Sequence, residues 1–134
     1  MVVQKNLQAF FYPDTVAVIG ASATPGKVGH TIVANMLEAG YKGRIIPVNP
    51  KGGEIEGLPV IADVADLPVG LDLAVISVPR RFVMPSMQAL AAIKVKSVIV
   101  ITAGFKEIGK EGWYLEQELL ELCREHKIAL LGPN

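Results

Sequence analysis

The residues of this chain with the clearest chemical potential form a glycine- and serine-containing loop directly after a short apolar run. The apolar run covers residues 16–19, and the loop after it contains Gly20, Ser22, Gly26 and Lys27 before an expected helix. Glycines let the backbone approach a ligand closely, and a helix N-terminus offers free N–H groups with a partial positive charge. The pattern therefore predicts a phosphate-binding loop between a strand and a helix.

The spacing within this loop departs from the two commonest phosphate-binding motifs. A P-loop follows G-x-x-x-x-G-K-S/T, with the hydroxyl for magnesium. Here five residues separate Gly20 from Gly26, and Val28 follows Lys27. The dinucleotide fingerprint G-x-G-x-x-G is shorter than the G-x-S-x-x-x-G-x-x-G of this chain. The spacing disfavours both a nucleoside triphosphatase and a dehydrogenase.

A lysine follows the second apolar run, residues 44–48. That run ends in Asn49, Pro50 and Lys51, and not in the acidic residue that binds the ribose hydroxyls of a dinucleotide. A lysine there favours an extra phosphate on the ribose, which NADP carries at the 2′ position and coenzyme A at the 3′ position. We expect Lys51 to contact such a phosphate, with a solvated loop lysine as the alternative.

Composition limits the classes of protein to which the chain can belong. Its 134 residues are enough for about one domain, and 51% of them are hydrophobic, so a packed core is expected. Thirteen basic and thirteen acidic residues give no electrostatic case for nucleic acid or an anionic membrane. Cys123 is the single cysteine, which excludes an internal disulfide and fits a reducing, cytoplasmic compartment.

Apolar runs with the character of strands alternate with helical patterns along the chain. This order predicts βαβ units and a Rossmann-like, doubly wound parallel sheet in a three-layer α/β/α fold. Strands are expected at 15–19, 44–48, 73–78, 96–101 and 128–131, and helices at 28–39, 82–93 and 111–127. A small strand at 59–62 and a helical turn at 63–67 complete the expected elements. Helical spacing places Val28, Ile32, Met36 and Ala39 on one face of the first helix. On the last helix Leu115, Leu119, Leu122 and His126 share a face, and Cys123 is expected on the inner side, in the core. The ligand crevice of such a sheet lies at the carboxyl ends of its strands.

Several short motifs in fixed order resemble one known family. They are FYP at 11–13, VAVIGAS at 16–22, PGKVG at 25–29, GYKG at 40–43, PVNPK at 47–51, DLAVISVP at 72–79, ITAGF at 101–105 and GPN at 132–134. Together they resemble the coenzyme A-binding domain of the nucleoside-diphosphate-forming acyl-CoA synthetases. That group includes ADP-forming acetate–CoA ligase and the alpha subunit of succinyl-CoA synthetase.

The resemblance implies a CoA-binding domain, residues 1–134, at the N-terminus of a longer ligase. Such ligases interconvert acid, CoA and ATP with acyl-CoA, ADP and phosphate through an acyl phosphate and a phosphorylated histidine in a later domain. The implied partners are CoA or acyl-CoA and the downstream ligase domains, with no nucleic acid and no membrane. No catalysis is expected from this part alone.

Two alternatives stay open at this point. One is a module that senses CoA or acyl-CoA in a protein acetyltransferase, because some bacterial acetyltransferases carry a synthetase-like region. The other is an NADP-binding oxidoreductase domain, which the loop spacing disfavours.

The expected ligand contacts come from four strand ends. Backbone amides at 20–22 and the Ser22 hydroxyl are expected to face a phosphate, although a plain turn with Ser22 as helix N-cap is the structural alternative. By resemblance, residues 77–79 line the CoA site and residues 101–104 flank the pantetheine arm. The full expected set is Gly20, Ala21, Ser22, Pro25, Lys27, Val28, Val48, Asn49, Pro50, Lys51, Ser77, Val78, Pro79, Ile101, Thr102, Ala103 and Gly104.

Other polar residues carry weaker signals. Arg80 and Arg81 could bind the pyrophosphate or a partner, or could simply be exposed, because cations at a helix start are unfavourable without an anion nearby. His30 and His126 lack the neighbours of a catalytic triad or a metal site, so no catalytic or metal-binding residue is expected. Gly29 is expected to permit close packing of its helix.

Overall fold

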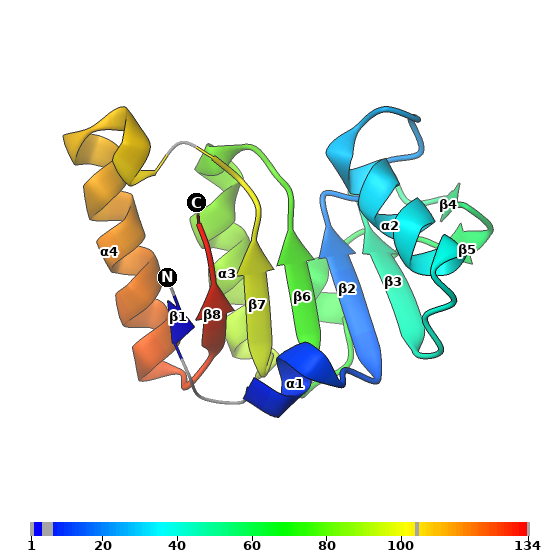
Figure 1. Cartoon of the computed structure of the whole chain (residues 1–134), viewed down its shortest axis with the longest axis horizontal. Coiled ribbons are helices and arrows are strands. Elements are labelled where there is room, and N and C mark those ends of the chain that lie inside the picture. The colour runs from blue at the N-terminus through cyan, green and yellow to red at the C-terminus, as the bar shows by residue number, and fades with distance from the viewer. Residues whose placement is uncertain (1, 4–6, 104, 134) are drawn as a thin grey trace.

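The structure, a computed structural model, describes residues 2–3, 7–103 and 105–133. Its strands are β1 (Val2–Val3), β2 (Thr15–Ile19), β3 (Arg44–Val48), β4 (Glu54–Ile55), β5 (Leu58–Pro59), β6 (Leu73–Ile76), β7 (Ser97–Val100) and β8 (Ala129–Leu131). Six of them form one sheet in the order β1-β8-β7-β6-β2-β3, and β4 and β5 form a separate hairpin (Figure 1). All pairs in the large sheet are parallel except β1 with β8.

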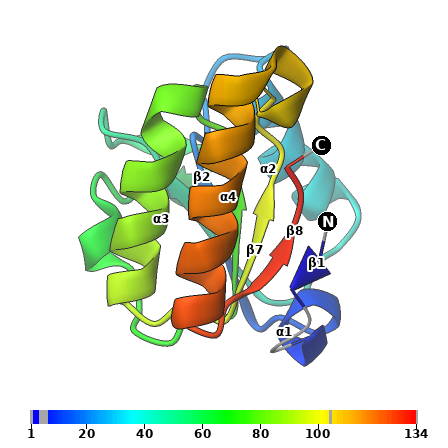
Figure 2. The ribbon, with the colours of Figure 1, turned by 90° about the vertical axis from the view of Figure 1, so that its left-hand side faces the viewer.

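Helices cover both faces of this sheet. They are α1 (Leu7–Phe11), α2 (Val28–Glu38), α3 (Val83–Ala92) and α4 (Lys110–Glu125), with 3₁₀ turns η1 (Val64–Asp66), η2 (Arg80–Phe82) and η3 (Lys106–Ile108). Helices α3 and α4 lie on one face, and α1 and α2 lie on the other (Figure 2). The predicted three-layer, Rossmann-like fold is therefore confirmed.

The predicted strands and long helices are all present, and most boundaries move by one or two residues. The strand expected at 73–78 ends at Ile76, because Ser77 and the residues after it turn away toward η2. The short β1 and α1 were not predicted. Of the β4–β5 hairpin, only the end was predicted, as part of a small strand at 59–62. These pieces are too short to carry a periodic pattern, so tertiary contacts decide their conformation.

The buried side of α2 differs from the predicted stripe. The sequence predicted an inward face of Val28, Ile32, Met36 and Ala39. The two middle residues are half-buried, but the first and last are exposed, and Gly29 and Val33 are the fully buried positions. The helix is rotated because Gly29, having no side chain, allows a close approach to the backbone of the loop after β2. The same kind of error places His126 inward on α4, whereas it is exposed.

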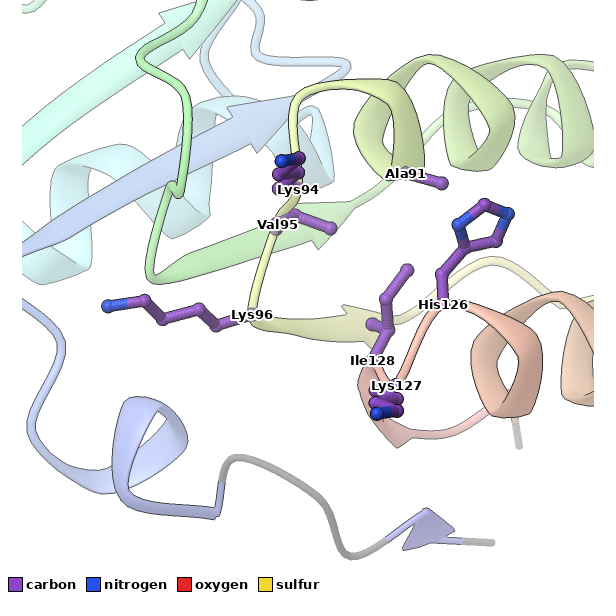
Figure 3. Close-up of a pocket in the computed structure, with 7 residues that line it drawn as sticks. All are labelled: Ala91, Lys94, Val95, Lys96, His126, Lys127 and Ile128. Atoms are coloured by element: carbon purple, nitrogen blue, oxygen red, sulfur yellow. The ribbon is translucent and has the colours of Figure 1, made fainter.

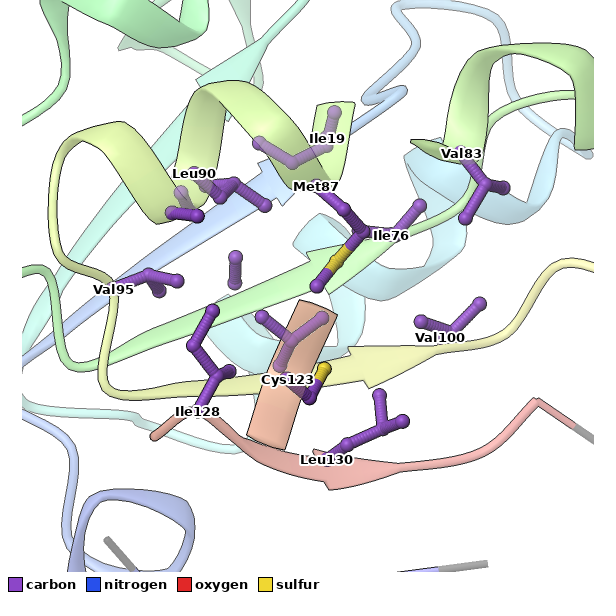
Figure 4. Packing of buried hydrophobic residues seen from close by; sticks show 14 of the residues in the cluster. Ile19, Ile76, Val83, Met87, Leu90, Val95, Val100, Cys123, Ile128 and Leu130 are labelled. Atoms are coloured by element: carbon purple, nitrogen blue, oxygen red, sulfur yellow. The ribbon is translucent and has the colours of Figure 1, made fainter. Parts of the chain in front are cut away.

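The main core lies between the sheet and the α3–α4 layer. Met87 and Leu90 of α3 and Cys123 of α4 converge on Ile76 of β6 and its neighbours (Figure 4). All four of these side chains are fully buried. Burial raises the pKa of the Cys123 thiol to about 12. The predicted core position of Cys123 is confirmed, and its thiol has the character of a small apolar group.

Asp72 joins three segments at the edge where the parallel strands begin. Its Oδ2 accepts hydrogen bonds from the amides of Asp14 (3.0 Å) and Thr15 (3.2 Å), and its Oδ1 lies 3.2 Å from Lys96 Nζ. Burial alone would raise the pKa of Asp72, but the hydrogen bonds from Lys96 and the two amides outweigh it and hold the pKa below its ordinary value. The carboxylate therefore stabilises the folded state while it is ionised.

Within the described residues, no helix has the length and apolar character needed to cross a membrane.

Candidate functional site

The candidate site lies where β2, β3 and β6 end together. In the parallel register Ile19 stands beside Val48 of β3 and beside Ile76 of β6. From β2 the chain crosses to β3 through α2 on one face, and from β6 it crosses to β7 through α3 on the other face (Figures 1 and 2). The carboxyl ends of β2 and β6 therefore form the switch point at which open α/β sheets bind ligands.

The first two residues of the glycine loop continue the sheet. The amides of Gly20 and Ala21 both donate to the Val48 carbonyl oxygen, at 3.1 and 3.2 Å. These two amides therefore extend the β2–β3 hydrogen bonding beyond the strand, and contact of Gly20 or Ala21 with a phosphate stays a prediction. The side chain of Ala21 is fully buried in the core beside α2.

The free donors of the loop begin one residue later. Among the described residues, none accepts a hydrogen bond from the amides of Ser22, Ala23 or Gly26. Ser22 Oγ accepts from the Thr24 amide at 3.0 Å, which shapes the loop as a tight local turn. Ser22 is not the helix cap, because α2 begins at Val28 and its N-cap residue, Lys27, makes no side-chain capping bond.

Two glycines bring the loop, α2 and β6 into contact. Gly20 has φ +89°, and a Cβ there would collide with the Ser77 carbonyl. A Cβ on Gly29 would collide with the Gly20 carbonyl oxygen. The predicted packing role of Gly29 is confirmed, and its contact is with the loop backbone.

The second strand end is fastened to the loop through Asn49. Its Nδ2 donates to the Ala21 carbonyl at 2.8 Å, and its Oδ1 accepts from the Lys51 amide at 2.8 Å. Pro50 and Lys51 are exposed beside it, and Lys51 forms no ion pair with the described residues. The Lys51 ammonium is therefore available to an anion.

A cavity of about 380 Å³ opens at the same edge, on the side of the sheet that carries α3. Its lining is mostly apolar and consists of Ile19, Gly20, Val48, Pro50, Ala62, Val64, Ser77, Val78, Pro79, Phe82 and Ser86. Six of these residues were predicted as ligand contacts. Ile19 is the last residue of a predicted strand. The other four, Ala62, Val64, Phe82 and Ser86, had no signal in the sequence, because they come from turns and a helix face that only the fold brings here.

The end of β7 is the third part of the predicted set. Thr102 Oγ1 donates to the Val78 carbonyl at 2.6 Å, so its hydroxyl joins the ends of β6 and β7. Ile101 and Ala103 are exposed next to it, outside the cavity lining, and Gly104 lies outside the described residues. Contact between this segment and a ligand stays a prediction.

Three other residues near the site, Arg80, Arg81 and His30, have partners within the protein. Arg80 Nη2 lies 3.8 Å from Glu111 Oε1, and the Arg81 guanidinium lies 4.7 Å from the centre of the Phe82 ring. His30, in the first turn of α2, has its Nε2 2.8 Å from Glu56 Oε1 in the turn between β4 and β5. No group of three or more metal-ligating side chains occurs within the described part of the chain.

A second cavity, of about 430 Å³, lies at the opposite edge of the sheet. It is lined by Ala91, Lys94, Val95, Lys96, His126, Lys127 and Ile128 (Figure 3). The positions of its lysines can be explained by their roles in the fold. Lys94 and Lys127 directly follow the last turns of α3 and α4, where positive charge compensates the exposed carbonyls. Lys96 extends away from the other residues, toward its partner Asp72 (Figure 3). No predicted ligand residue lies here.

Comparison with known proteins adds family relationships. The profile of the family described as CoA binding domain matches residues 14–134. The alpha subunit of acetate–CoA ligase (ADP-forming) I from Pyrococcus furiosus is 47% identical over 96% of this chain, which covers 29% of that protein. The ADP-forming 4-hydroxybutyrate–CoA ligase of Nitrosopumilus maritimus is 38% identical over 91% of this chain and 17% of its own length.

A solved structure gives the same picture. The dinucleotide-forming acetyl-coenzyme A synthetase 1 of Ca. Korarchaeum cryptofilum, in complex with phosphate and ADP, superimposes with a TM-score of 0.90 at 41% identity. The match covers 96% of this chain and 27% of that one. The chain therefore spans less than a third of the length of each of these relatives.

Proposed function

Because this chain belongs to the family of CoA-binding domains, as its motifs predicted, we propose that it is the CoA-binding domain of an ADP-forming acyl-CoA synthetase. Its cofactor is coenzyme A. The proposed whole enzyme interconverts acid, CoA and ATP with acyl-CoA, ADP and phosphate. Residues 1–134 supply the CoA site in this proposal, and the remaining chemistry belongs to other domains.

One observation carries this proposal for the site: amide donors and a lysine meet at the switch point beside an apolar cavity. The amides of Ser22, Ala23 and Gly26, together with the N-terminus of α2, suit a pyrophosphate. Lys51 suits the ribose phosphate, and the cavity suits an uncharged part of the molecule. CoA has all three of these chemical parts, and it is long enough to extend beyond a cavity of about 380 Å³.

We also propose that these residues form one domain of a longer ligase in a reducing, cytoplasmic compartment. The support for the first part is the 29% share of the Pyrococcus furiosus subunit that the chain covers. The support for the second part is a single, fully buried cysteine, Cys123. The acyl group is left open, because the relatives act on acids as different as acetate and 4-hydroxybutyrate.

Isothermal titration calorimetry of the 134-residue chain with CoA, dephospho-CoA and NADP tests the proposal. We expect CoA to bind with a Kd of about 1 μM or weaker, since domains that complete the site are absent. NADP is expected to bind more weakly than CoA. Tight NADP binding without CoA binding would favour an oxidoreductase domain and overturn the proposal.

The variant Lys51→Ala tests the contact with the ribose phosphate. We expect it to weaken CoA binding by about five- to tenfold and dephospho-CoA binding by less than about twofold, because only CoA carries the 3′ phosphate. Lys42→Ala removes another exposed lysine, in the turn before β3, and is the matched control. Equal losses for both ligands would show that Lys51 does not contact that phosphate.

A further inference from the structure

Asn49 uses both ends of its side-chain amide inside the protein. Its two partners fix the orientation of this amide, because the Ala21 carbonyl can only accept a hydrogen bond and the Lys51 amide can only donate one. Both distances are 2.8 Å, which is well within the range of good hydrogen bonds. Asn49 was predicted as a ligand contact, but these bonds connect the glycine loop with the turn that carries Lys51.

The turn that carries Lys51 has little else to hold it. One backbone bond closes it, from the Gly52 amide to the Asn49 carbonyl at 2.9 Å, and a second bond, from the Val60 amide to the Gly53 carbonyl at 2.9 Å, holds its far end. Gly52 and Gly53 follow with φ of +63° and +85°, and a Cβ at either position would meet open space. Glycines without packing neighbours permit many backbone conformations. The Asn49 side chain bonds directly to the Lys51 amide and to the glycine loop, and it therefore restrains where the Lys51 backbone lies relative to that loop.

The far end of the same segment is fastened to α2. The His30–Glu56 contact of 2.8 Å joins the first turn of α2 to the β4–β5 hairpin. Ile55 is 3% exposed and packs in the same cluster as Ala21 and Val33. Residues 49–56 are thus attached at both ends to the unit formed by the glycine loop and α2, and Lys51 lies between the attachments.

We propose that Asn49 is a positioning residue through which Lys51 selects ligands with a ribose phosphate. A lysine is a mobile point charge on a long stem, so its selectivity depends on a fixed backbone origin. By holding that origin against the glycine loop, Asn49 sets the separation between the loop amides and the ammonium group. A ligand carrying both phosphate groups can then contact both at once. This inference rests on the proposed function.

A double-mutant cycle tests the inference, with the ratio of dephospho-CoA Kd to CoA Kd as its readout. Calorimetry is done on the wild-type chain, Asn49→Ala, Lys51→Ala and the double variant. We expect Asn49→Ala to lower the ratio about three- to fivefold, and to lower it no further when Lys51 is already alanine. A purely structural role would weaken both ligands alike and leave the ratio unchanged.

Two further variants complete the design. Asn35→Ala, at an exposed position of α2, is the matched control and should keep the wild-type ratio. A serine hydroxyl can accept from the amide two residues on but cannot reach Ala21, so Asn49→Ser should give a ratio between those of wild type and Asn49→Ala. If Asn49→Ala does not fold, Asn49→Ser decides, and an unchanged ratio overturns the inference.

The outcomes that would contradict the role of Asn49 differ from the outcome that would contradict the proposed CoA site. A ratio in the double variant that lies below the ratio of Lys51→Ala alone would mean that Asn49 acts independently of Lys51, and the inference would be wrong. An unchanged ratio in Asn49→Ala would overturn it as well, but it would not contradict the proposed CoA site. Absence of CoA binding to the wild-type chain would instead overturn the proposed site itself.

Discussion

Gly29 is the position where one added methyl group should disturb both stability and ligand binding. The Cβ of Gly29→Ala would collide with the Gly20 carbonyl oxygen and would lie 3.0 Å from the Cα of Ala21. Both obstacles are backbone, and the Gly20 residue is itself held by its bond to Val48. No side chain can move to relieve the overlap, so α2 must shift away from the loop.

Two opposing effects decide the size of the change. Overpacking of this kind costs about 2–3 kcal/mol, whereas replacing a helical glycine by alanine stabilises by about 1 kcal/mol. The net expectation is a loss of about 1–2 kcal/mol in the free energy of unfolding. For a chain of this size, that corresponds to a fall in Tm of about 4–7 °C. CoA affinity should fall about fivefold or more, because the amides at the start of α2 move with the helix.

Urea unfolding followed by circular dichroism, together with calorimetric titration of CoA, measures both effects. Asn35→Ala is the control for helix propensity, since Asn35 is exposed on the same helix and its replacement should stabilise by about 0.5 kcal/mol. If Gly29→Ala proved as stable as the wild type, the gain in helix propensity would equal the cost of overpacking. The close approach of α2 to the loop would then be refuted.

Two other predictions concern ionisable groups. Asp72→Asn should lower stability by about 2 kcal/mol at pH 7, because the carboxylate accepts from Lys96 and from two amides. Since the folded-state pKa of Asp72 is lowered, this stability is present above the unfolded pKa of about 3.9 and is lost as the pH falls through the folded value. Urea titrations should therefore show the difference between the two proteins narrowing below about pH 4, and a pH-independent difference would contradict the assignment. Cys123, buried and with a pKa of about 12, should resist iodoacetamide at pH 8 until urea unfolds the chain; rapid labelling of the native protein would contradict its burial.

Much of the site could be predicted because local sequence controls it. The Gly20 turn and the end of β3 at Val48 follow from apolar runs that stop at glycine or proline, and six predicted residues line the cavity. The roles within the loop could not be predicted. The amides of Gly20 and Ala21 are used by a strand about thirty residues later in the sequence, and only pairing of β2 with β3 makes that acceptor available.

Contacts between segments far apart in the sequence explain the other features that were not predicted. Phe82 and Ser86 belong to η2 and α3, and they reach the cavity because α3 crosses the sheet beside the end of β2. His30 looked isolated in the sequence, yet its partner Glu56 lies in a hairpin that folds back against α2. The inward face of α2 is centred on Gly29 because close packing, and not hydrophobicity alone, sets the rotation of that helix.

The amino-acid sequence by itself determined the layers, the parallel strands and the edge of the sheet where we propose that a phosphorylated ligand binds, because periodicity and glycine turns are local properties. Tertiary structure alone decided which loop amides have no acceptor among the described residues, which side chains link distant segments, and where Lys51 is held. Those outcomes depend on hydrogen-bond partners and packing contacts between segments far apart in the chain, and no local pattern records them.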